Sequence, residues 1–359
     1  MAKKCFMDIH VIETVPPSCI NRDDTGSPKT AIYGGAMRAR VSSQCWKKAM
    51  RASFADMLPQ EEIGKRTKML HALLADAIRV RNPQLKAEKL AEEALKAAGI
   101  SPKADKKNKD VLKTDALFFV SQSQLDSLAD IAVETEGGKF DKKACQAALK
   151  ANPAVDVALF GRMVADDPSL NFDAAAQVAH AISTHAMHNE YDYFTAVDDC
   201  APEDNAGAGH LGTVEYNSST LYRYATVDVS ELASNLGERT PEAVRAFIRA
   251  FILSMPTGKK NTFANNVLPN AVYVTVRHDQ PISLVGAFES PVKTRDSGYV
   301  ENSISALVKH AHAVYSEYLG EPDAAFAIGH GMDALAETMP LNTLLDKVEE
   351  CARTYGGQA

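Results

Sequence analysis

The stretch CINRDDTGSPKTAIYGGAMRARVSSQCWKKAMR, residues 19–51, gathers positive charge in a chain that is acidic overall. Between Arg22 and Arg51 it carries seven basic residues and two acidic ones, which is a net charge of +5 over thirty residues. The whole chain of 359 residues has a formal net charge of −7, so the other 329 residues sum to −12. Such a chain can bind a polyanion through one strip while the rest of its surface repels it.

The stretch and its surroundings divide into a loop, a strand and a helix. Residues 16–35 hold three prolines and three glycines, which predicts a loop. Residues 37–42, MRARVS, alternate between side chains of two kinds, which predicts a strand. Ser42 or Ser43 then makes a good N-cap for a helix. At helical spacing, one face of that helix presents Trp46, Ala49, Met50, Ser53 and Met57, and the opposite face presents Gln44, Lys47, Lys48 and Arg51.

The polar side of this strand and helix forms a candidate track for phosphate groups. Arg38 and Arg40 project from one strand face, and the N–H groups at the helix start add partial positive charge. A solvated helix face is the alternative, but it normally mixes both signs, and no acidic residue occurs between Asp24 and Asp56. A phosphodiester chain is therefore the favoured partner, and Gln44 adds a side chain able to bond a base edge or a sugar hydroxyl. Alternation alone does not assign the two arginines to RNA, to a neighbouring protein or to solvent.

Composition indicates an ordinary soluble globular protein, with 45% hydrophobic and 24% charged residues. No run of eighteen apolar residues exists, so we expect no membrane span. Acidic residues interrupt any signal-peptide core near the N-terminus, which makes the cytoplasm the expected location. Six scattered cysteines without a C-x-x-C pair argue against a zinc site and against a disulfide framework.

The remaining pattern predicts an α+β fold with a helical insertion. Residues 5–15 alternate as a strand does, and residues 59–168 look helical with no strong strand pattern. Within that block, residues 101–110, SPKADKKNKD, are the strongest candidate for disorder. Residues 172–197 are expected to form a helix and then a strand, and further strands are expected late in the chain.

Two weaker basic or metal-binding candidates remain. The stretch Gly258–Thr262 resembles the end of a phosphate loop but lacks the upstream glycine, so a nucleotide site is disfavoured. Lys259 and Lys260 could still touch RNA as a second basic loop. His180, His185 and His188 would lie on the predicted helix, where core or helix-end hydrogen bonding is favoured over a metal site.

Asp23 and Asp24 are the only candidates for catalysis by metal-dependent phosphodiester cleavage. The favoured reading is that they cap a turn or pair with nearby arginines. No convincing Ser/His/Asp or Cys/His nucleophile occurs, and no metal site or cofactor is expected.

Residues 16–51 closely resemble the N-terminal signature of the CasC family, the backbone subunit of the type I-E CRISPR Cascade complex. The resemblance continues in order along most of the chain and is weakest in residues 60–150 and after residue 300. The matching stretches are DVALFGRM (156–163), AQVAHAISTHAMHNEYDYFTAVDD (176–199), GHLGTVEYNSSTLYRYATVDV (209–229) and AFESPVK (287–293).

The resemblance implies a non-catalytic protein. Copies of it would line up head to tail along the CRISPR RNA, grip its phosphate backbone and present the spacer for pairing with target DNA. The implied protein partners are the other Cascade subunits: the large subunit, the small subunit, the 5′-end cap subunit and the 3′-end processing endonuclease. The runner-up is a metal-dependent ribonuclease of the same fold group using Asp23 or Asp24, and a phosphate-metabolite enzyme using Gly258 and Lys259 ranks third.

The resemblance also implies a hand-like shape with an RNA-recognition-motif-like (ferredoxin-like) palm, helical fingers and a thumb hairpin. The palm would comprise residues 1–58, 169–193 and 219–359, the fingers 59–168 and the thumb 194–218, with a flexible loop at CAPEDNAGAG, residues 200–209. The implied RNA-backbone contacts are Arg22, Lys29, Ser42, Gln44, Lys47, Lys48 and Arg51. Met163 matches a methionine that wedges against the bases, and the implied thumb contacts are His210, Leu211 and Thr213.

Overall fold

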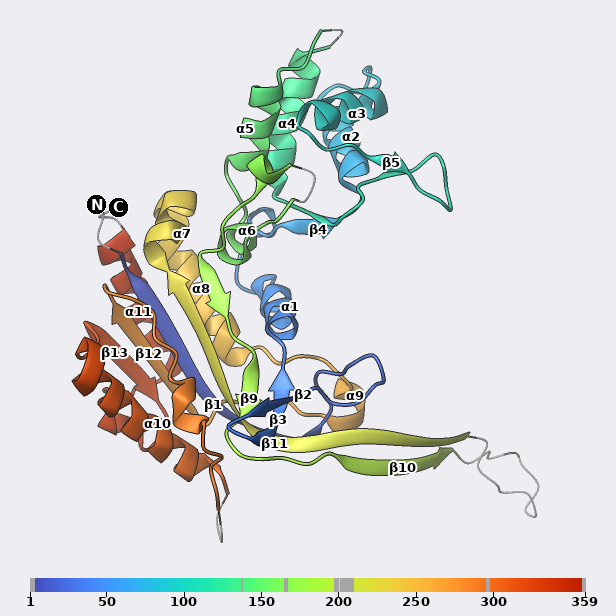
Figure 1. The fold of residues 1–359 in the computed structure, drawn as a ribbon. Helices are drawn as coiled ribbons and strands as arrows, with labels where there is room; N and C mark the ends of the chain where they lie inside the picture. The colour runs from blue at the N-terminus through green and yellow to red at the C-terminus, as the bar shows by residue number, and fades with distance from the viewer. Residues whose placement is uncertain are drawn as a thin grey trace.

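The computed structural model describes residues 4–136, 138–164, 167–196, 200, 210–294 and 298–356. A nine-stranded antiparallel sheet forms its centre, with strand order β13-β12-β1-β11-β9-β3-β2 and with β8 and β10 also paired to β11 (Figure 1). The strands are β1 Phe6–Ser18, β2 Thr30–Tyr33, β3 Ala36–Val41, β8 Ala176–Val178, β9 Ala181–Ser183, β10 Glu190–Ala196, β11 His210–Asp228, β12 Ala271–Arg277 and β13 Ala324–Ile328. The predicted α+β class is confirmed.

The two faces of β1 belong to two different hydrophobic layers. Met7, Ile9 and Val11 pack with the helices on one side of the sheet, whereas Ile12 packs on the other side beneath α10. The helices of the first layer are α1 Ser43–Phe54, α7 Val229–Leu236, α8 Thr240–Leu253 and α11 Leu341–Gly356, and α10 spans Val300–Val314. The alternation predicted for residues 5–15 therefore corresponds to a strand buried on both faces.

A block of helices inserted between α1 and β8 has a hydrophobic core of its own, which includes Leu74, Leu95 and Leu128. We call this block, from Gln60 to Leu170, the insertion; it stands above the sheet in Figure 1. Its elements are α2 Leu70–Arg81, α3 Ala87–Ala97, α4 Gln122–Glu134, α5 Lys142–Lys150, α6 Val155–Phe160 and the short strands β4 Lys65–Thr67, β5 Lys103–Ala104, β6 Leu112–Lys113 and β7 Phe118–Val120. Its helical character is as expected, but the four short strands were not predicted.

A long hairpin projects from the sheet as an arm (Figure 1). β10 pairs with the first part of β11, from Glu190 opposite Tyr216 to Ala196 opposite His210, and the second part of β11 pairs with β1. Residues 201–209, which hold most of the loop expected at the thumb, lie outside the described residues.

The helix predicted at the start of residues 172–197 is wrong. This segment forms the short strands β8 and β9, which pair with β11 through Val178 opposite Ala225 and Ser183 opposite Leu221. Its alanine-rich composition favours a helix locally, but pairing with a distant strand decides its conformation.

The disorder predicted for residues 101–110 is also wrong. Lys103 and Ala104 pair with Lys113 and Leu112 in a small hairpin. Two ion pairs close it, Lys103–Asp115 at 2.5 Å and Lys113–Asp105 at 3.2 Å. Because the lysines and the aspartates that balance them are spread along the thirteen residues from Lys103 to Asp115, composition alone does not indicate this hairpin.

None of the helices in the described part of the chain combines the length and the hydrophobicity that spanning a bilayer requires. All six cysteines lie in the described part of the chain, and none of them forms a disulfide.

Candidate nucleic-acid interface

Helix α1 presents the basic side chains, and its placement follows from its sequence. The Ser42 hydroxyl accepts a hydrogen bond from the Cys45 N–H at 3.3 Å and so caps the helix, as predicted. Trp46, Met50 and Phe54 are fully buried on the sheet side of the helix. This packing leaves the opposite face, with its lysines, directed away from the sheet. Ser42 itself, a predicted RNA contact, is almost entirely buried.

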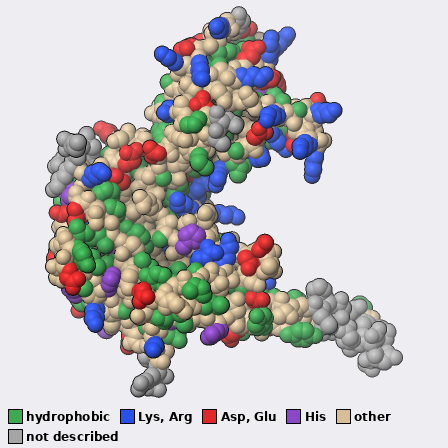
Figure 2. Space-filling view, viewed as in Figure 1, with side chains coloured by type: hydrophobic (Ala, Val, Ile, Leu, Met, Phe, Trp, Pro, Cys, Tyr) green, Lys and Arg blue, Asp and Glu red, His purple; other side chains and the backbone are tan. Residues whose placement is uncertain are grey.

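A hollow of about 890 Å³ lies between α1 and the insertion, and we call it the basic hollow. It brings together five of the predicted contacts, namely Gln44, Lys47, Lys48, Arg51 and Met163. Figure 2 shows blue side chains on this concave side of the molecule, between the insertion and the hairpin arm. Its lining also includes Arg66, Leu117, Phe119, Phe160, Gly161, Arg162 and residues 171–174.

Part of the lining of the basic hollow is apolar and aromatic. Met163, which is 85% exposed, lines the hollow together with Phe119 and Phe160. The Lys47 ammonium stands 5.5 Å from the centre of the Phe160 ring, and burial lowers the pKa of Lys47. Cations beside apolar and aromatic surface suit a chain of phosphates and bases.

Arg162 lines the same hollow but has a structural role. It is buried, and its guanidinium donates hydrogen bonds to the carbonyl oxygens of Phe119, Leu149 and Leu170 at 2.8–3.0 Å. Burial lowers its pKa to about 10. Its donors are therefore used to hold the insertion together.

A second hollow, of about 700 Å³, lies on another side of α1, and we call it the loop hollow. Arg22, Lys48 and Lys259 line it, so Lys48 borders both hollows. The glycine at position 258 permits this arrangement, because a Cβ there would lie 2.3 Å from the Ile20 carbonyl oxygen. Lys260 is exposed on the short helix α9, Lys260–Phe263, and lines neither of these two hollows.

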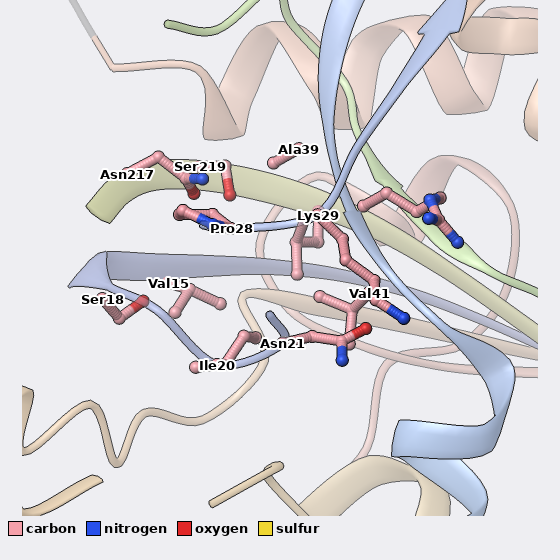
Figure 3. Close-up of a pocket in the computed structure, with 12 residues that line it drawn as sticks. Val15, Ser18, Ile20, Asn21, Pro28, Lys29, Ala39, Val41, Asn217 and Ser219 are labelled. Atoms are coloured by element: carbon pink, nitrogen blue, oxygen red, sulfur yellow. The ribbon is translucent and has the colours of Figure 1, made fainter. Parts of the chain in front are cut away.

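Lys29 lies apart from both hollows. It lines a cavity of about 20 Å³ together with Asn21, Arg40 and residues of β1 and β11 (Figure 3). That volume suits about one water molecule. Lys29 is partly exposed, and its neighbours on β1 and β11 place it at the root of the hairpin arm.

The two arginines of β3, Arg38 and Arg40, do not form part of the phosphate-binding surface that the sequence suggested. Arg38 is fully buried and donates hydrogen bonds to the carbonyl oxygens of Ser183 and Phe288, both at 2.9 Å. It cannot meet a phosphate, because its guanidinium faces protein carbonyls. Arg40 is partly exposed, and its guanidinium donates to the Thr30 carbonyl oxygen at 3.0 Å and contacts His180 Nδ1 at 3.1 Å.

Asp23 closes a turn, as the favoured reading expected. Its Oδ1 accepts hydrogen bonds from the Thr25 hydroxyl at 2.7 Å, the Thr25 N–H at 2.9 Å and the Ser27 N–H at 3.0 Å. The Thr25 hydroxyl hydrogen bond is the main cause of the lowered pKa of Asp23. Asp24 is exposed beside it in the loop hollow. Among the described residues, no group of three or more His, Cys, Asp and Glu side chains could hold a metal ion.

The three histidines do not lie on a helix. His185 is buried in a hydrogen-bonded setting: Nδ1 donates to the Ala186 carbonyl oxygen at 2.9 Å, and Nε2 accepts from the Thr220 N–H at 3.1 Å. It also stacks on Tyr299 with 3.7 Å between ring centres. Both ring nitrogens are used, so His185 is structural, and His188 is exposed.

The hairpin arm carries one of the predicted thumb side chains within the described part, Thr213, which is exposed on β11. The side chains of His210 and Leu211 lie outside the described residues. Two exposed aromatic side chains on β10, Tyr191 and Tyr193, were missed, and they are 66% and 64% exposed. Their spacing of two residues places them on the same face of the strand. Arg66 was also missed, because it lies in the block 59–168 that looks helical from its sequence, whereas the structure places it on the short strand β4.

The profile of a family described as CT1975-like protein matches residues 7–350. A chain of a solved "CRISPR RNA-guided surveillance complex, pre-nicking" is 34% identical, with a TM-score of 0.81 over 97% of this chain and 100% of that chain. A chain of another "CRISPR RNA-guided surveillance complex" is 30% identical, with a TM-score of 0.64 over 97% and 99%. Among curated protein sequences, none matches.

Proposed function

Since this chain belongs to the CT1975-like protein family, we propose that it is an RNA-binding backbone subunit of a CRISPR RNA-guided surveillance complex. The expected kinship with CasC-type Cascade subunits is confirmed by the family match and by the two structural matches over nearly the whole chain. The finer type I-E assignment rests on the sequence signature of residues 16–51.

The observation that carries this proposal is the basic hollow. Lys47, Lys48, Arg51 and Arg66 line it, and among the described residues Arg51 is the one of these four cations that forms an ion pair, with Asp156. One acidic residue, Asp173, also lines the hollow. Positive side chains along one groove bind a phosphate backbone and do not read its sequence. A subunit that must hold any spacer needs this property, because the base edges must stay free to pair with target DNA.

The assembly that follows is a filament. Copies would bind head to tail along the CRISPR RNA, since a contact between two different surfaces need not close into a ring. In this proposal residues 1–58, 169–193 and 219–359 form an RNA-recognition-motif-like palm, residues 59–168 the fingers and residues 194–218 the thumb. The projecting hairpin of β10 and β11 supports an arm that reaches a neighbouring copy. The large and small subunits, the 5′-end cap subunit and the 3′-end processing endonuclease would complete the particle in the cytoplasm.

The proposed role is non-catalytic. The rival role, a metal-dependent ribonuclease using Asp23 or Asp24, needs a carboxylate free to bind a metal. The Asp23 Oδ1 atom instead accepts three hydrogen bonds from its own turn. Asp24 would have to act without a cluster of further acidic or histidine ligands from the described residues.

Removing both lysines of α1 tests the proposal. In the Lys47→Ala/Lys48→Ala variant we expect the affinity for an oligouridylate to fall about tenfold or more, because two charged phosphate contacts are lost. The slope of log affinity against log salt concentration should become shallower by about 1.4, as two fewer counterions are released from a single strand. Fluorescence anisotropy over a series of KCl concentrations measures both quantities.

The matched control removes two exposed lysines elsewhere. Lys309 lies on α10 and Lys347 on α11, so Lys309→Ala/Lys347→Ala makes the same change in net charge away from both hollows. Its slope should equal that of the natural protein. If both double variants change the slope equally, the binding depends on overall charge and not on the basic hollow, and the proposal fails.

A further inference from the structure

Arg51 connects α1 to three separate segments of the insertion. Its Nε donates to Asp156 Oδ2 at 2.8 Å, and its Nη2 donates to the Gly64 carbonyl oxygen at 3.1 Å. Its guanidinium also lies 4.4 Å from the centre of the Phe119 ring. These partners belong to the start of the insertion, to α6 near its end and to β7.

Asp156 links two segments of the chain, which we call the crossings: the segment at residue 64, where the chain enters the insertion, and the segment at residue 156, where it leaves. Its side chain is completely buried, and its second oxygen, Oδ1, accepts the Gly64 N–H at 2.7 Å. Only glycine fits at position 64, because a Cβ would lie 2.7 Å from the Phe119 ring and 2.9 Å from Asp156 Oδ1. One carboxylate thus holds residue 64, residue 156 and the guanidinium of α1 in a single cluster, which we call the clasp.

The clasp borders the basic hollow. About a quarter of the Arg51 side chain, 26%, is exposed, and that part lines the hollow beside Lys47 and Arg66. Its Nη1 group has no hydrogen-bond partner among the described residues, whereas Nε and Nη2 are engaged. A guanidinium is rigid and planar, so a phosphate bound at its free edge fixes the orientation of the edge that holds Asp156 and Gly64.

We propose that Arg51 and Asp156 are positioning residues that couple phosphate binding in the basic hollow to the placement of the insertion over α1. The inference rests on the proposed function in one respect, that RNA occupies the hollow. When a phosphate binds the free edge of Arg51, the clasp tightens at both crossings. By linkage, a loosened clasp weakens RNA binding by the same factor.

The coupling differs from two simpler roles. If Arg51 were only a phosphate ligand, the negative charge of Asp156 would oppose phosphate binding. Replacing Asp156 by an uncharged residue would then strengthen RNA binding. If the clasp were only structural, RNA would leave it unchanged. Because Asp156 already balances the Arg51 charge, Arg51 should also contribute less to the salt slope than Lys47 or Lys48 does.

Hydrogen exchange of the full-length chain tests the coupling directly. The Gly64 amide is buried and hydrogen-bonded to Asp156, so RNA cannot shield it by contact. In the natural protein, saturating oligouridylate should slow exchange of the peptide covering Gly64 by about tenfold, within the usual range of coupling between sites. In Asp156→Asn, the same RNA should bind about tenfold more weakly and leave Gly64 exchange unchanged.

Arg51→Lys provides a second variant, because lysine keeps the charge and loses the planar fork. It should keep the salt slope and lose the RNA-dependent protection of Gly64. Emission of the only tryptophan, Trp46, which is buried on α1, reports whether each variant is folded. If RNA binds the natural protein with a lysine-dependent slope and Gly64 exchange does not change, the coupling is refuted while the proposed function stands. Absence of any RNA binding would refute the proposed function first.

Discussion

Asp8 is buried on the side of β1 that faces α10. Its Oδ1 accepts the Tyr224 hydroxyl at 2.8 Å, and its Oδ2 accepts the Ile282 N–H at 2.9 Å. Burial is the main influence and raises its pKa from 3.8 to about 6, while these hydrogen bonds act in the opposite direction. A single carboxyl group therefore makes the stability of the sheet depend on pH near neutrality.

The folded protein binds the Asp8 proton more tightly than the unfolded chain does. The resulting stabilisation is complete below the unfolded pKa of 3.8 and is lost as the pH rises through about 6. Relative to Asp8→Asn, the natural protein should gain up to roughly 3 kcal/mol in free energy of unfolding between pH 7 and pH 4. Urea denaturation of both proteins across this range measures the difference. If the free energy of unfolding changed with pH in the same way for both proteins, Asp8 would have the same pKa in the folded and unfolded states, and the prediction would fail.

At the scale of single residues, local sequence predicted which lysines are available to bind phosphate, but it did not predict which arginines are. Lys47 and Lys48 are directed away from the sheet because helical spacing places them opposite Trp46. Arg38 and Arg51 look equally available in the sequence. Arg38 donates a hydrogen bond to the Ser183 carbonyl oxygen, 145 positions away in the sequence. Arg51 donates one to the Asp156 carboxylate, 105 positions away. No local pattern indicates such partners.

At the scale of elements, α1 could be predicted from its own sequence, whereas β8 and β9 could not. The start of α1 could be predicted because its cap, Ser42, and its apolar stripe lie within the element itself. β8 and β9 are short, rich in alanine, and held by pairing with β11. Their conformation depends on a strand some forty residues later, so their own sequence favours the wrong structure.

The hairpin arm carries exposed aromatic side chains on β10. Tyr191 and Tyr193 share one face of β10, and on its other face the Phe194 ring packs against Gly212, where a Cβ would lie 2.4 Å from it. If the arm contacts RNA bases, stacking on the tyrosines contributes about 1–3 kcal/mol per base. Tyr191→Ala/Tyr193→Ala should therefore weaken oligouridylate binding by at least about fivefold and leave the salt slope unchanged. Anisotropy titrations measure both.

The control for that variant is Tyr318→Ala, since Tyr318 is 76% exposed on the turn after α10. It should bind RNA as the natural protein does. Because all three tyrosines are exposed, thermal unfolding should be nearly the same for every variant. Equal affinity in the double variant and the control would remove the arm from the RNA-binding surface.

At the scale of the whole molecule, the binding surface exists only where the parts meet. The basic hollow is formed by α1 on one side and by the insertion on the other, with Met163 from the segment that leaves the insertion. The rest of the chain is acidic, with a net charge of −7 overall, so a filament of these subunits would be positive mainly along its inner groove. The sequence indicates the basic half of this surface, because its charges are contiguous. The apolar and aromatic half comes from residues 117–172, where only Met163 was predicted, through the family resemblance of residues 156–163.

In the proposed filament, copies of this chain bind one RNA side by side. Mass photometry of the purified full-length protein with oligouridylates of increasing length tests it most directly. The account predicts complexes that grow in steps of one 38.8 kDa chain, with a copy number proportional to RNA length. A single copy bound at every RNA length, or no bound RNA at all, would contradict it.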